Sequence, residues 1–319
     1  SVNNEKIEAE KIIKSNQYLF SFENIKACLN FQYTENGFRY TVKIQNEGNE
    51  DFAPETLGLD IGIDTCMCTY PEWNDIYFPT FFRCEKTHFY GLLKKPNGET
   101  LGICCKQPIA SYSHNFNSSG HRIYNSQLDF LNCPPLPKHH PLNCHILKAK
   151  EAREYVIDFF ACSDDENWRE ILAQTYGLPM INAEKFTLEK GEYIRPVISS
   201  NKEYKTTLIS PSGKEIKDFL AKDYGLYSLE VQTADGFSST AYFYCRKPFE
   251  WYLKNAREEV VDKMPHATTH CESWYGFFSG FLAAQHYPDT EKDEIINSVA
   301  PLREELKCSV ANAKKYEHL

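Results

Sequence analysis

The sequence lacks the features that would identify several common classes of protein. Its 319 residues carry a formal net charge of −9 and contain no long run of Lys or Arg. Because binding to nucleic acid relies on clustered basic side chains, we expect no nucleic-acid partner. The most apolar segment, residues 271–286, is shorter than the roughly 20 residues of a transmembrane helix. The sequence therefore predicts no membrane span, and it shows no signal peptide.

The short motifs of the commonest enzyme families are missing as well. The chain has no GxSxG, GxxxxGK[ST], HExxH or dinucleotide-binding fingerprint. Each of these patterns places specific groups around a nucleophile, a phosphate, a zinc ion or a pyrophosphate. Their absence leaves the usual hydrolase, kinase, zinc-protease and Rossmann interpretations without support, and we expect no cofactor.

The 12 cysteines include no CxxC pair. Cys66 and Cys68 are two residues apart, which on a strand places them on one face, whereas the adjacent Cys104 and Cys105 point to opposite faces. Neither spacing matches a zinc site or a redox motif, so no metal is expected. Most cysteines stand in apolar strands and are predicted to be buried free thiols. A few disulfides are the alternative, and Cys133–Cys144 is the first pair to check.

Residues 1–162 are predicted to form a large antiparallel β-sandwich. Aromatic residues, which favour strands, are abundant, with 20 Tyr and 21 Phe. A short polar helix is expected over residues 1–17. Three hairpins should follow, with turns at residues 34–37, 96–98 and 150–151, and Gly37 is expected to accept a positive φ in the first.

A helical connector over residues 163–185 and a small β-domain over residues 186–247 come next. Ser163 precedes the helix as N-cap and Glu166 completes a capping box, while Gly177 is placed to end the helix. The small domain has four candidate strands, and Tyr227 stands in a run similar to the tyrosine corner of immunoglobulin-like sandwiches. We therefore predict an Ig-like sandwich.

Residues 248–319 are predicted to be helical. An amphipathic helix follows Pro248, and residues 271–286 are apolar on nearly every face. A helix of that kind needs neighbouring protein on all sides. The fold class predicted for the chain is thus mainly β, with a large sandwich, a small Ig-like sandwich and a short α-helical segment.

The segment from residue 111 to residue 145 has the highest density of polar and aromatic side chains. A sugar site needs flat aromatic faces for the C–H side of the ring and planar polar groups for the hydroxyls. The candidate sugar-contacting residues here are Tyr112, His114, Arg122, Tyr124, His139 and His140, and the candidate catalytic residues are His121 and Asp129. The alternative is a long connecting loop, stiffened by prolines, whose histidines are satisfied locally.

Two further clusters are candidates. Trp73 is a possible stacking platform in a region that also carries scattered acids, among them Glu85. Paired carboxylates would suit glycoside hydrolysis, although scattered acids usually lie on solvated surfaces. The last cluster combines His270 and Glu272 as candidate acid and base with Trp274 and Tyr275 as candidate substrate contacts. Its alternative is an ordinary helix start in which an acidic side chain favours the helix dipole.

Taken in order, the chain resembles multidomain polysaccharide-degrading enzymes of gut Bacteroidetes. The resemblance rests on YFPTFFRCEKTHFYGLLKKPNGETLGI, HRIYNSQLDFLNCPPLPKHHPLN and THCESWYGFFSGFLAAQHYPD. In those enzymes a β-supersandwich precedes an (α/α) toroid, of which residues 248–319 would be only the start. The resemblance implies a poly- or oligosaccharide partner and a periplasmic or secreted location. It implies a glycoside hydrolase or polysaccharide lyase, or the N-terminal portion of one. A non-catalytic glycan-binding or structural module is the alternative.

Overall fold

The computed structural model describes residues 1–258, apart from residues 4, 15, 62–71, 117–122 and 134–135. The chain divides into two compact units. One comprises Ser1–Phe186, Ile194–Phe219 and Leu226–Phe243, and the other comprises Thr187–Tyr193, Leu220–Gly225 and Tyr244–Leu319. The predicted helices beyond residue 258 lie outside the described residues, and the predicted four-part domain division stays a prediction.

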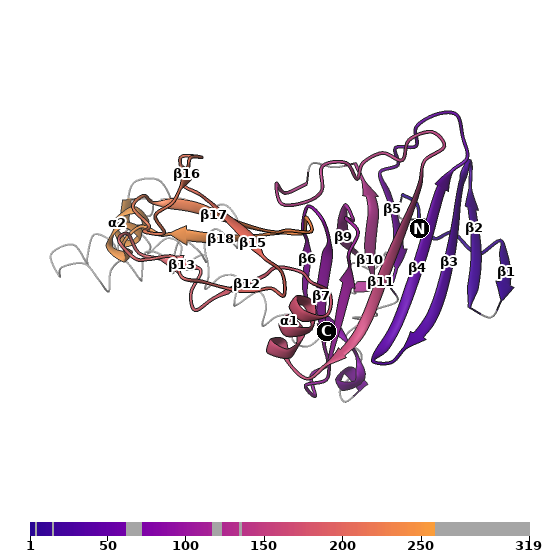
Figure 1. Cartoon of the computed structure of the whole chain (residues 1–319), viewed down its shortest axis with the longest axis horizontal. Helices are drawn as coiled ribbons and strands as arrows, with labels where there is room; N and C mark the ends of the chain where they lie inside the picture. The colour runs from indigo at the N-terminus through magenta and orange to yellow at the C-terminus, as the bar shows by residue number, and fades with distance from the viewer. Residues whose placement is uncertain (4, 15, 62–71, 117–122, 134–135, 259–319) are drawn as a thin grey trace, which may run out of the picture. The chain divides into compact units, whose positions relative to one another are not determined.

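An eight-stranded antiparallel sheet dominates the first unit, and its strands β1 to β4 can be followed side by side in Figure 1. Its strands are, in order, β1 (Lys11–Lys14), β2 (Gln17–Phe22), β3 (Ile25–Thr34), β4 (Gly37–Asn46), β11 (Ala152–Cys162), β8 (Thr100–Cys105), β7 (Phe89–Lys94) and β6 (Phe78–Cys84). The β3–β4 hairpin turns where the sequence predicts it, but Gly37 does not have the positive φ that was expected. Gly37 is required there, because a Cβ at this position would lie 2.0 Å from the Phe159 carbonyl oxygen.

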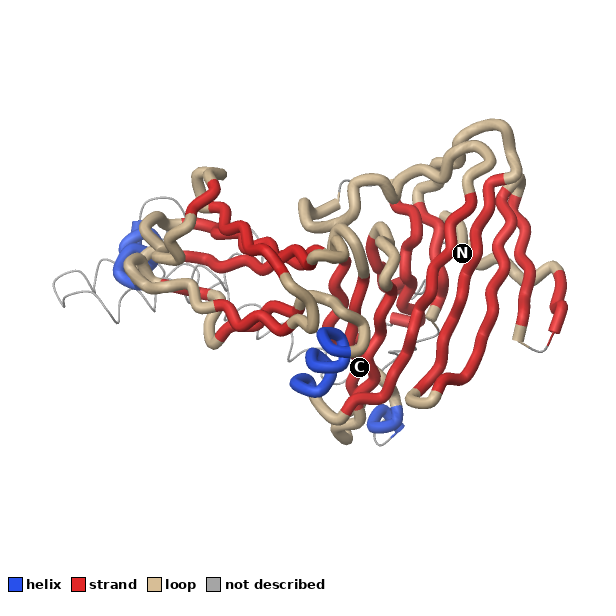
Figure 2. Tube along the Cα trace, in the orientation of Figure 1, coloured by secondary structure: helices blue, strands red, loops and turns tan. Residues whose placement is uncertain are grey.

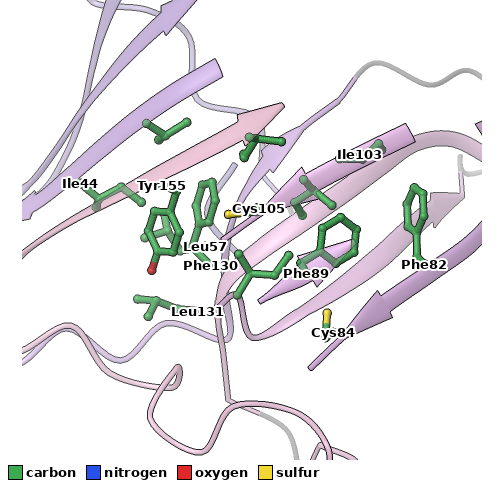
Figure 3. Close-up of a cluster of buried hydrophobic side chains, with 14 of the residues drawn as sticks. Ile44, Leu57, Phe82, Cys84, Phe89, Ile103, Cys105, Phe130, Leu131 and Tyr155 are labelled. Carbon is green, nitrogen blue, oxygen red and sulfur yellow. The ribbon is translucent and has the colours of Figure 1, made fainter. Parts of the chain in front are cut away.

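A three-stranded antiparallel sheet forms the second layer of the sandwich. It has the order β5 (Thr56–Asp60), β10 (Ile123–Asn132) and β9 (Ser111–Phe116). The core between the two layers is built from inward-facing residues of most of these strands, and Figure 3 shows a part of it. Phe130 of β10 stacks on Tyr155 of β11, with ring centroids 4.2 Å apart. The predicted large antiparallel sandwich is confirmed.

Strands β7, β8 and β11 are buried on both faces. Phe89, Ile103 and Cys105 face the sandwich core, whereas Tyr90 and Cys104 belong to a second cluster with Trp168 of helix α1. Burial of both faces explains why β7 reads as a continuous apolar run rather than as alternation. The adjacent cysteines Cys104 and Cys105 do point to opposite faces, as predicted.

Helix α1 (Asp165–Gln174) occupies the predicted connector. Its N-cap is Asp164 rather than Ser163, and the Asp164 carboxylate accepts hydrogen bonds from the backbone N–H groups of Glu166 and Asn167. Asp164 is one residue closer to the first helical turn, so its carboxylate reaches both free donors. Gly177 follows the helix with φ = +72°, which suits its predicted role in ending it.

The remaining strands form a two-stranded and a five-stranded sheet (Figure 2). The first pairs β12 (Met180–Ala183) with β14 (Pro196–Ser199), and the second has the order β13 (Thr187–Leu188), β18 (Ser238–Cys245), β17 (Gly225–Thr233), β15 (Tyr204–Ile209) and β16 (Glu215–Ile216). The four predicted strands of this region are present as β14, β15, β17 and β18. The Ig-like description of the small domain stays a prediction.

The helices of the described chain are few and short. Besides α1, they are the 3-10 helix η1 (Glu72–Asp75) and α2 (Phe249–Glu258). Neither α1 nor α2 has the length and apolar character that a membrane-crossing helix requires.

Two local predictions are wrong. The expected N-terminal helix is replaced by strand β1, which pairs with β2 through Lys11 and Leu19. The third expected hairpin does not form either, because Leu147 bridges to Phe52 and β11 pairs with β4 and β8. In the first case a local hairpin forms where the polar composition favoured a helix. In the second case pairing with distant residues overrides the pattern read from neighbouring ones.

The cysteines of the described chain are all free thiols. Cys133 is exposed and Cys144 is buried, so the suggested disulfide is not present. Most of the others are buried, including Cys84, Cys104 and Cys105, which agrees with their predicted role as small apolar residues.

Candidate functional site

Asp129 lies at the centre of the predicted polar segment, on strand β10. Its carboxylate is fully buried and accepts hydrogen bonds from Ser111 Oγ at 2.7 Å, Gln127 Nε2 at 2.6 Å and Ser113 Oγ at 3.2 Å. Burial raises the pKa of this carboxyl, and the hydrogen bonds oppose the shift. Ser111 and Ser113 share one face of β9, next to β10, which is why the sequence brings them together. Asp129 is thus held rigidly by its own sheet.

Tyr112 and His114 occupy the opposite face of β9. Their rings pack against Phe82 of β6, with centroids 5.2 Å and 6.0 Å away. His114 Nδ1 also lies 2.9 Å from Ser126 Oγ, and burial lowers the pKa of the imidazole. Tyr112 keeps 36% of its surface exposed. The neutral His114 and the open Tyr112 ring therefore lie side by side as a partly accessible aromatic pair.

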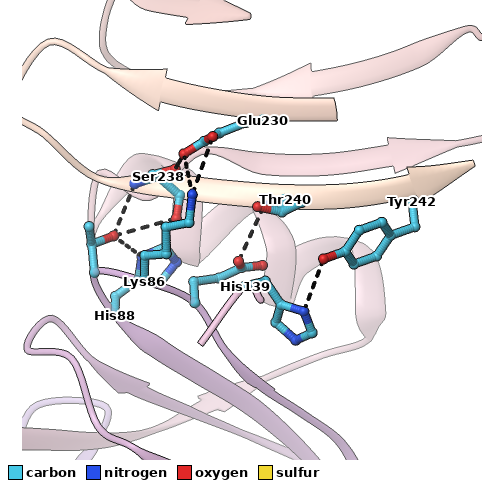
Figure 4. A network of polar contacts seen from close by, with 9 residues as sticks. Lys86, His88, His139, Glu230, Ser238, Thr240 and Tyr242 are labelled. Atoms are coloured by element: carbon cyan, nitrogen blue, oxygen red, sulfur yellow. Dashed lines mark hydrogen bonds and ion pairs between the residues drawn. The ribbon is translucent and has the colours of Figure 1, made fainter. Parts of the chain in front are cut away.

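His139 and His140 have different surroundings despite being neighbours. The His140 ring is buried, with Nδ1 2.8 Å from the Ala110 carbonyl oxygen, where only an N–H can donate. His139 Nδ1 lies 3.2 Å from the Tyr242 hydroxyl of β18, as Figure 4 shows. Burial, aided by the charge of Arg83, lowers the pKa of His139 to about 4. Both imidazoles are therefore neutral at physiological pH.

Several predicted site residues cannot be placed. His121, Arg122, His270, Glu272, Trp274 and Tyr275 lie outside the described residues. Trp73 belongs to η1 and Tyr124 to β10, and the side chains of both lie outside the described part of the chain. Within that part, no group of three His, Cys, Asp or Glu side chains is positioned to hold a metal ion.

A buried polar network joins the β6–β7 turn to strand β18. Arg83 Nε donates to Glu85 Oε1 at 2.8 Å, and Arg83 NH2 donates to the Thr240 carbonyl oxygen at 2.5 Å. The Thr240 backbone N–H donates in return to Glu85 Oε2 at 3.2 Å. Glu85 is fully buried, which corrects the expectation of a solvated acid. Burial raises its pKa to about 7 and outweighs the opposing effect of Arg83.

His88 lies beside this network and is also fully buried. Its Nδ1 is 2.9 Å from Thr87 Oγ1, and Thr87 Oγ1 accepts from the Ser238 backbone N–H at 3.0 Å (Figure 4). Burial and the charge of Arg83 lower the pKa of His88 to about 3. At the exposed rim, Lys86 pairs with Glu230 at 3.2 Å. The β6–β7 turn and strands β17 and β18 are therefore held together by charge and hydrogen bonds.

A cleft of about 480 Å³ lies beside this network, between β6, α1, β12 and β18. Its volume is within the roughly 300–1,000 Å³ typical of ligand sites. It is lined by Thr80, Phe81, Arg83, Tyr90, Leu92, Asp165, Trp168, Arg169, Met180, Ile181, Asn182, Phe186, Ser239, Thr240, Ala241 and Tyr242. The cleft thus combines exposed aromatic rings with two arginines and a side-chain amide.

The aromatic wall of the cleft is rigid. Phe81 is 44% exposed and packs against Tyr90 and Trp168, with ring centroids 6.0 Å and 5.8 Å away. Trp168 is itself fixed, because its Nε1 donates to the Gly91 carbonyl oxygen at 2.9 Å. Arg83 lies over the Tyr242 ring on the other side, 5.8 Å from its centroid. Such fixed faces bind a flat ligand without losing side-chain entropy.

The cleft was not predicted from the sequence, although strand β6 belongs to a region that the sequence singled out. Phe82 and Cys84 of β6 face the sandwich core, so Phe81 and Arg83 must face the other way. That alternation was readable in the sequence. The positions of α1 and β18 against this face were not, because they depend on long-range packing. Of the predicted residues, His139 comes closest, through its contact with Tyr242.

Comparisons with known proteins identify the fold. No protein-family model and no curated protein matches the chain. Among solved structures, a protein described as a polysaccharide lyase superposes with a TM-score of 0.68 at 13% sequence identity. The match covers 91% of this chain and 49% of the lyase, so the chain spans about half the length of that protein. The chain therefore has the fold of one part of a polysaccharide-degrading enzyme.

Proposed function

We propose that the protein is a carbohydrate-active protein acting on complex glycans, and that this chain forms the β-rich portion of a polysaccharide lyase or glycoside hydrolase. The observation that carries the proposal is the structural likeness to a polysaccharide lyase over 91% of the chain. The cleft lined by Phe81, Tyr242 and two arginines gives the same portion a place to bind sugar. Since a protein encounters polymeric glycans mainly outside the cytoplasm, we propose a periplasmic or secreted location.

The alternative is a non-catalytic glycan-binding or structural module. Its support comes from the candidate catalytic region of the described chain, where the polar groups already have protein partners. Asp129 accepts three hydrogen bonds, His114 pairs with Ser126, and His140 contacts a carbonyl oxygen. A group with such partners is positioned by the fold, and a substrate would have to displace them.

A cleavage assay with the full chain tests whether catalytic machinery lies within these 319 residues. Polysaccharides would be incubated with the protein and the products followed by ultraviolet absorbance and by reducing ends. A lyase breaks the glycosidic bond by elimination and leaves a conjugated double bond that absorbs, whereas a hydrolase adds water and leaves none. Asp129→Asn would be tested beside the native chain.

New reducing ends from any polysaccharide would support the enzyme, and the absorbance would identify the class. Binding without cleavage would support the non-catalytic module or a portion of an enzyme whose catalytic residues lie outside these 319 residues. Neither binding nor cleavage across plant, algal and animal polysaccharides would refute a carbohydrate-active function.

A further inference from the structure

The charges around the cleft are unevenly compensated. Glu85 is ion-paired with Arg83, and Asp165 is ion-paired with Lys94. Arg169 lines the same cleft, and its NH1 donates only to the backbone oxygen of Asp165, at 3.1 Å. Among the residues that the structure describes, no carboxylate is ion-paired with Arg169. The cleft therefore carries an uncompensated positive charge in a chain of net charge −9.

The positive charge lies among groups suited to a sugar ring. Phe81 offers an exposed, fixed aromatic face, and the exposed Asn182 amide offers both a donor and an acceptor. A guanidinium binds a carboxylate or sulfate through parallel N–H donors, and these bonds are stronger than those between neutral groups. A neutral sugar would give the Arg169 guanidinium no anionic partner.

We propose that this cleft is a subsite for an anionic sugar unit, whose ring stacks on Phe81 and whose carboxylate or sulfate is bound by Arg169. This inference rests on the proposed function, because it specifies which kind of glycan the protein binds. Arg83 has a different role, because its guanidinium already donates hydrogen bonds to Glu85 and to the Thr240 carbonyl oxygen. It holds the Tyr242 wall of the cleft in place.

The test is isothermal titration of the full chain with matched pairs of oligosaccharides. The probes are galacturonate, alginate and hyaluronan fragments with their methyl esters, and carrageenan fragments, whose sulfate groups are their main charges, with their desulfated forms. The variants are Arg169→Gln and Phe81→Leu. Their controls are Arg195→Gln, an exposed arginine that does not line the cleft, and Tyr33→Leu, an aromatic residue that is 83% exposed.

We expect an anionic oligosaccharide to bind and its uncharged form to bind at least about tenfold more weakly. Arg169→Gln should weaken the anionic form by a similar factor and leave the uncharged form unchanged, while Phe81→Leu should weaken both. The two controls should behave as the native chain. The carboxylate and sulfate pairs show which anion is recognised.

Three results would overturn the inference. Equal binding of charged and uncharged forms would refute anion recognition while the carbohydrate-active function stands. Undiminished binding in both Arg169→Gln and Phe81→Leu would place the sugar elsewhere. Failure of every charged and uncharged glycan to bind would refute the subsite and the proposed function together.

Discussion

Replacing Glu85 by Gln should change how stability depends on pH. The Glu85 carboxyl has its pKa raised from 4.5 to about 7, because burial outweighs the ion pair with Arg83 and the Thr240 N–H. The folded state therefore holds a proton that the unfolded chain releases between these pH values. Stability from this group is fully present below pH 4.5 and is lost as the pH rises through 7. The shift corresponds to about 3 kcal/mol.

His88 has the opposite dependence, so it must be separated from Glu85. Its pKa falls from 6.5 to about 3, which means that its contribution is lost as the pH falls below 6.5. The two slopes partly cancel between pH 4.5 and 6.5 in the native protein. The His88 contribution cancels when the free energy of unfolding of the native chain is subtracted from that of Glu85→Gln, because both proteins contain His88.

Urea unfolding from pH 4.5 to 8 measures this difference. We expect Glu85→Gln to become more stable relative to the native chain by about 3 kcal/mol across the range. The exposed Glu154, replaced by Gln, is the matched control and should give a flat difference. If Glu85→Gln instead loses relative stability as the pH rises, the ion pair with Arg83 outweighs burial and the reasoning is wrong.

Three further changes test other parts of the structure. Trp168→Phe removes the buried donor to the Gly91 carbonyl oxygen and should cost about 1–3 kcal/mol in urea unfolding, with unchanged stability contradicting that bond. Asp129→Asn places an N–H₂ group against the Ser111 or Gln127 donors and should lower the free energy of unfolding by about 1–3 kcal/mol. Because the pKa of Asp129 is raised, the native chain itself loses stability as the pH rises, so the deficit of the variant should shrink. A deficit that grows with pH would contradict the raised pKa. Gly213→Ala, at φ = +79° in an open turn, should lower stability by about 1 kcal/mol through backbone strain alone, and a gain would contradict the turn geometry.

The sequence was a good guide to the fold where local patterns agreed with long-range packing. The turn before Gly37 and the helix ending before Gly177 are present because turn and cap residues act on their own neighbours. The Leu147 bridge was missed for the opposite reason, because its partner Phe52 is far away in the sequence. Strand β1 was missed although its partner Leu19 is close by, because the polar composition of residues 1–17 also suits a helix.

The site was less predictable than the fold. The sequence directed attention to residues 111–145, and Asp129, His114 and His140 of that segment proved to be tied to protein partners. The cleft joins β6 to α1, β12 and β18, which are separated by up to about half the chain. Single-sequence reasoning can find the exposed face of β6 but not the elements that pack against it.

Affinity electrophoresis of the full chain against plant, algal and animal polysaccharides tests the central claim most directly. The native chain, Phe81→Leu and Tyr33→Leu would be run in the same gels. We expect a polysaccharide to retard the native chain and Tyr33→Leu, and to retard Phe81→Leu less. Retardation of none of the three, in a chain shown to be folded by cooperative unfolding, would contradict a carbohydrate-active protein.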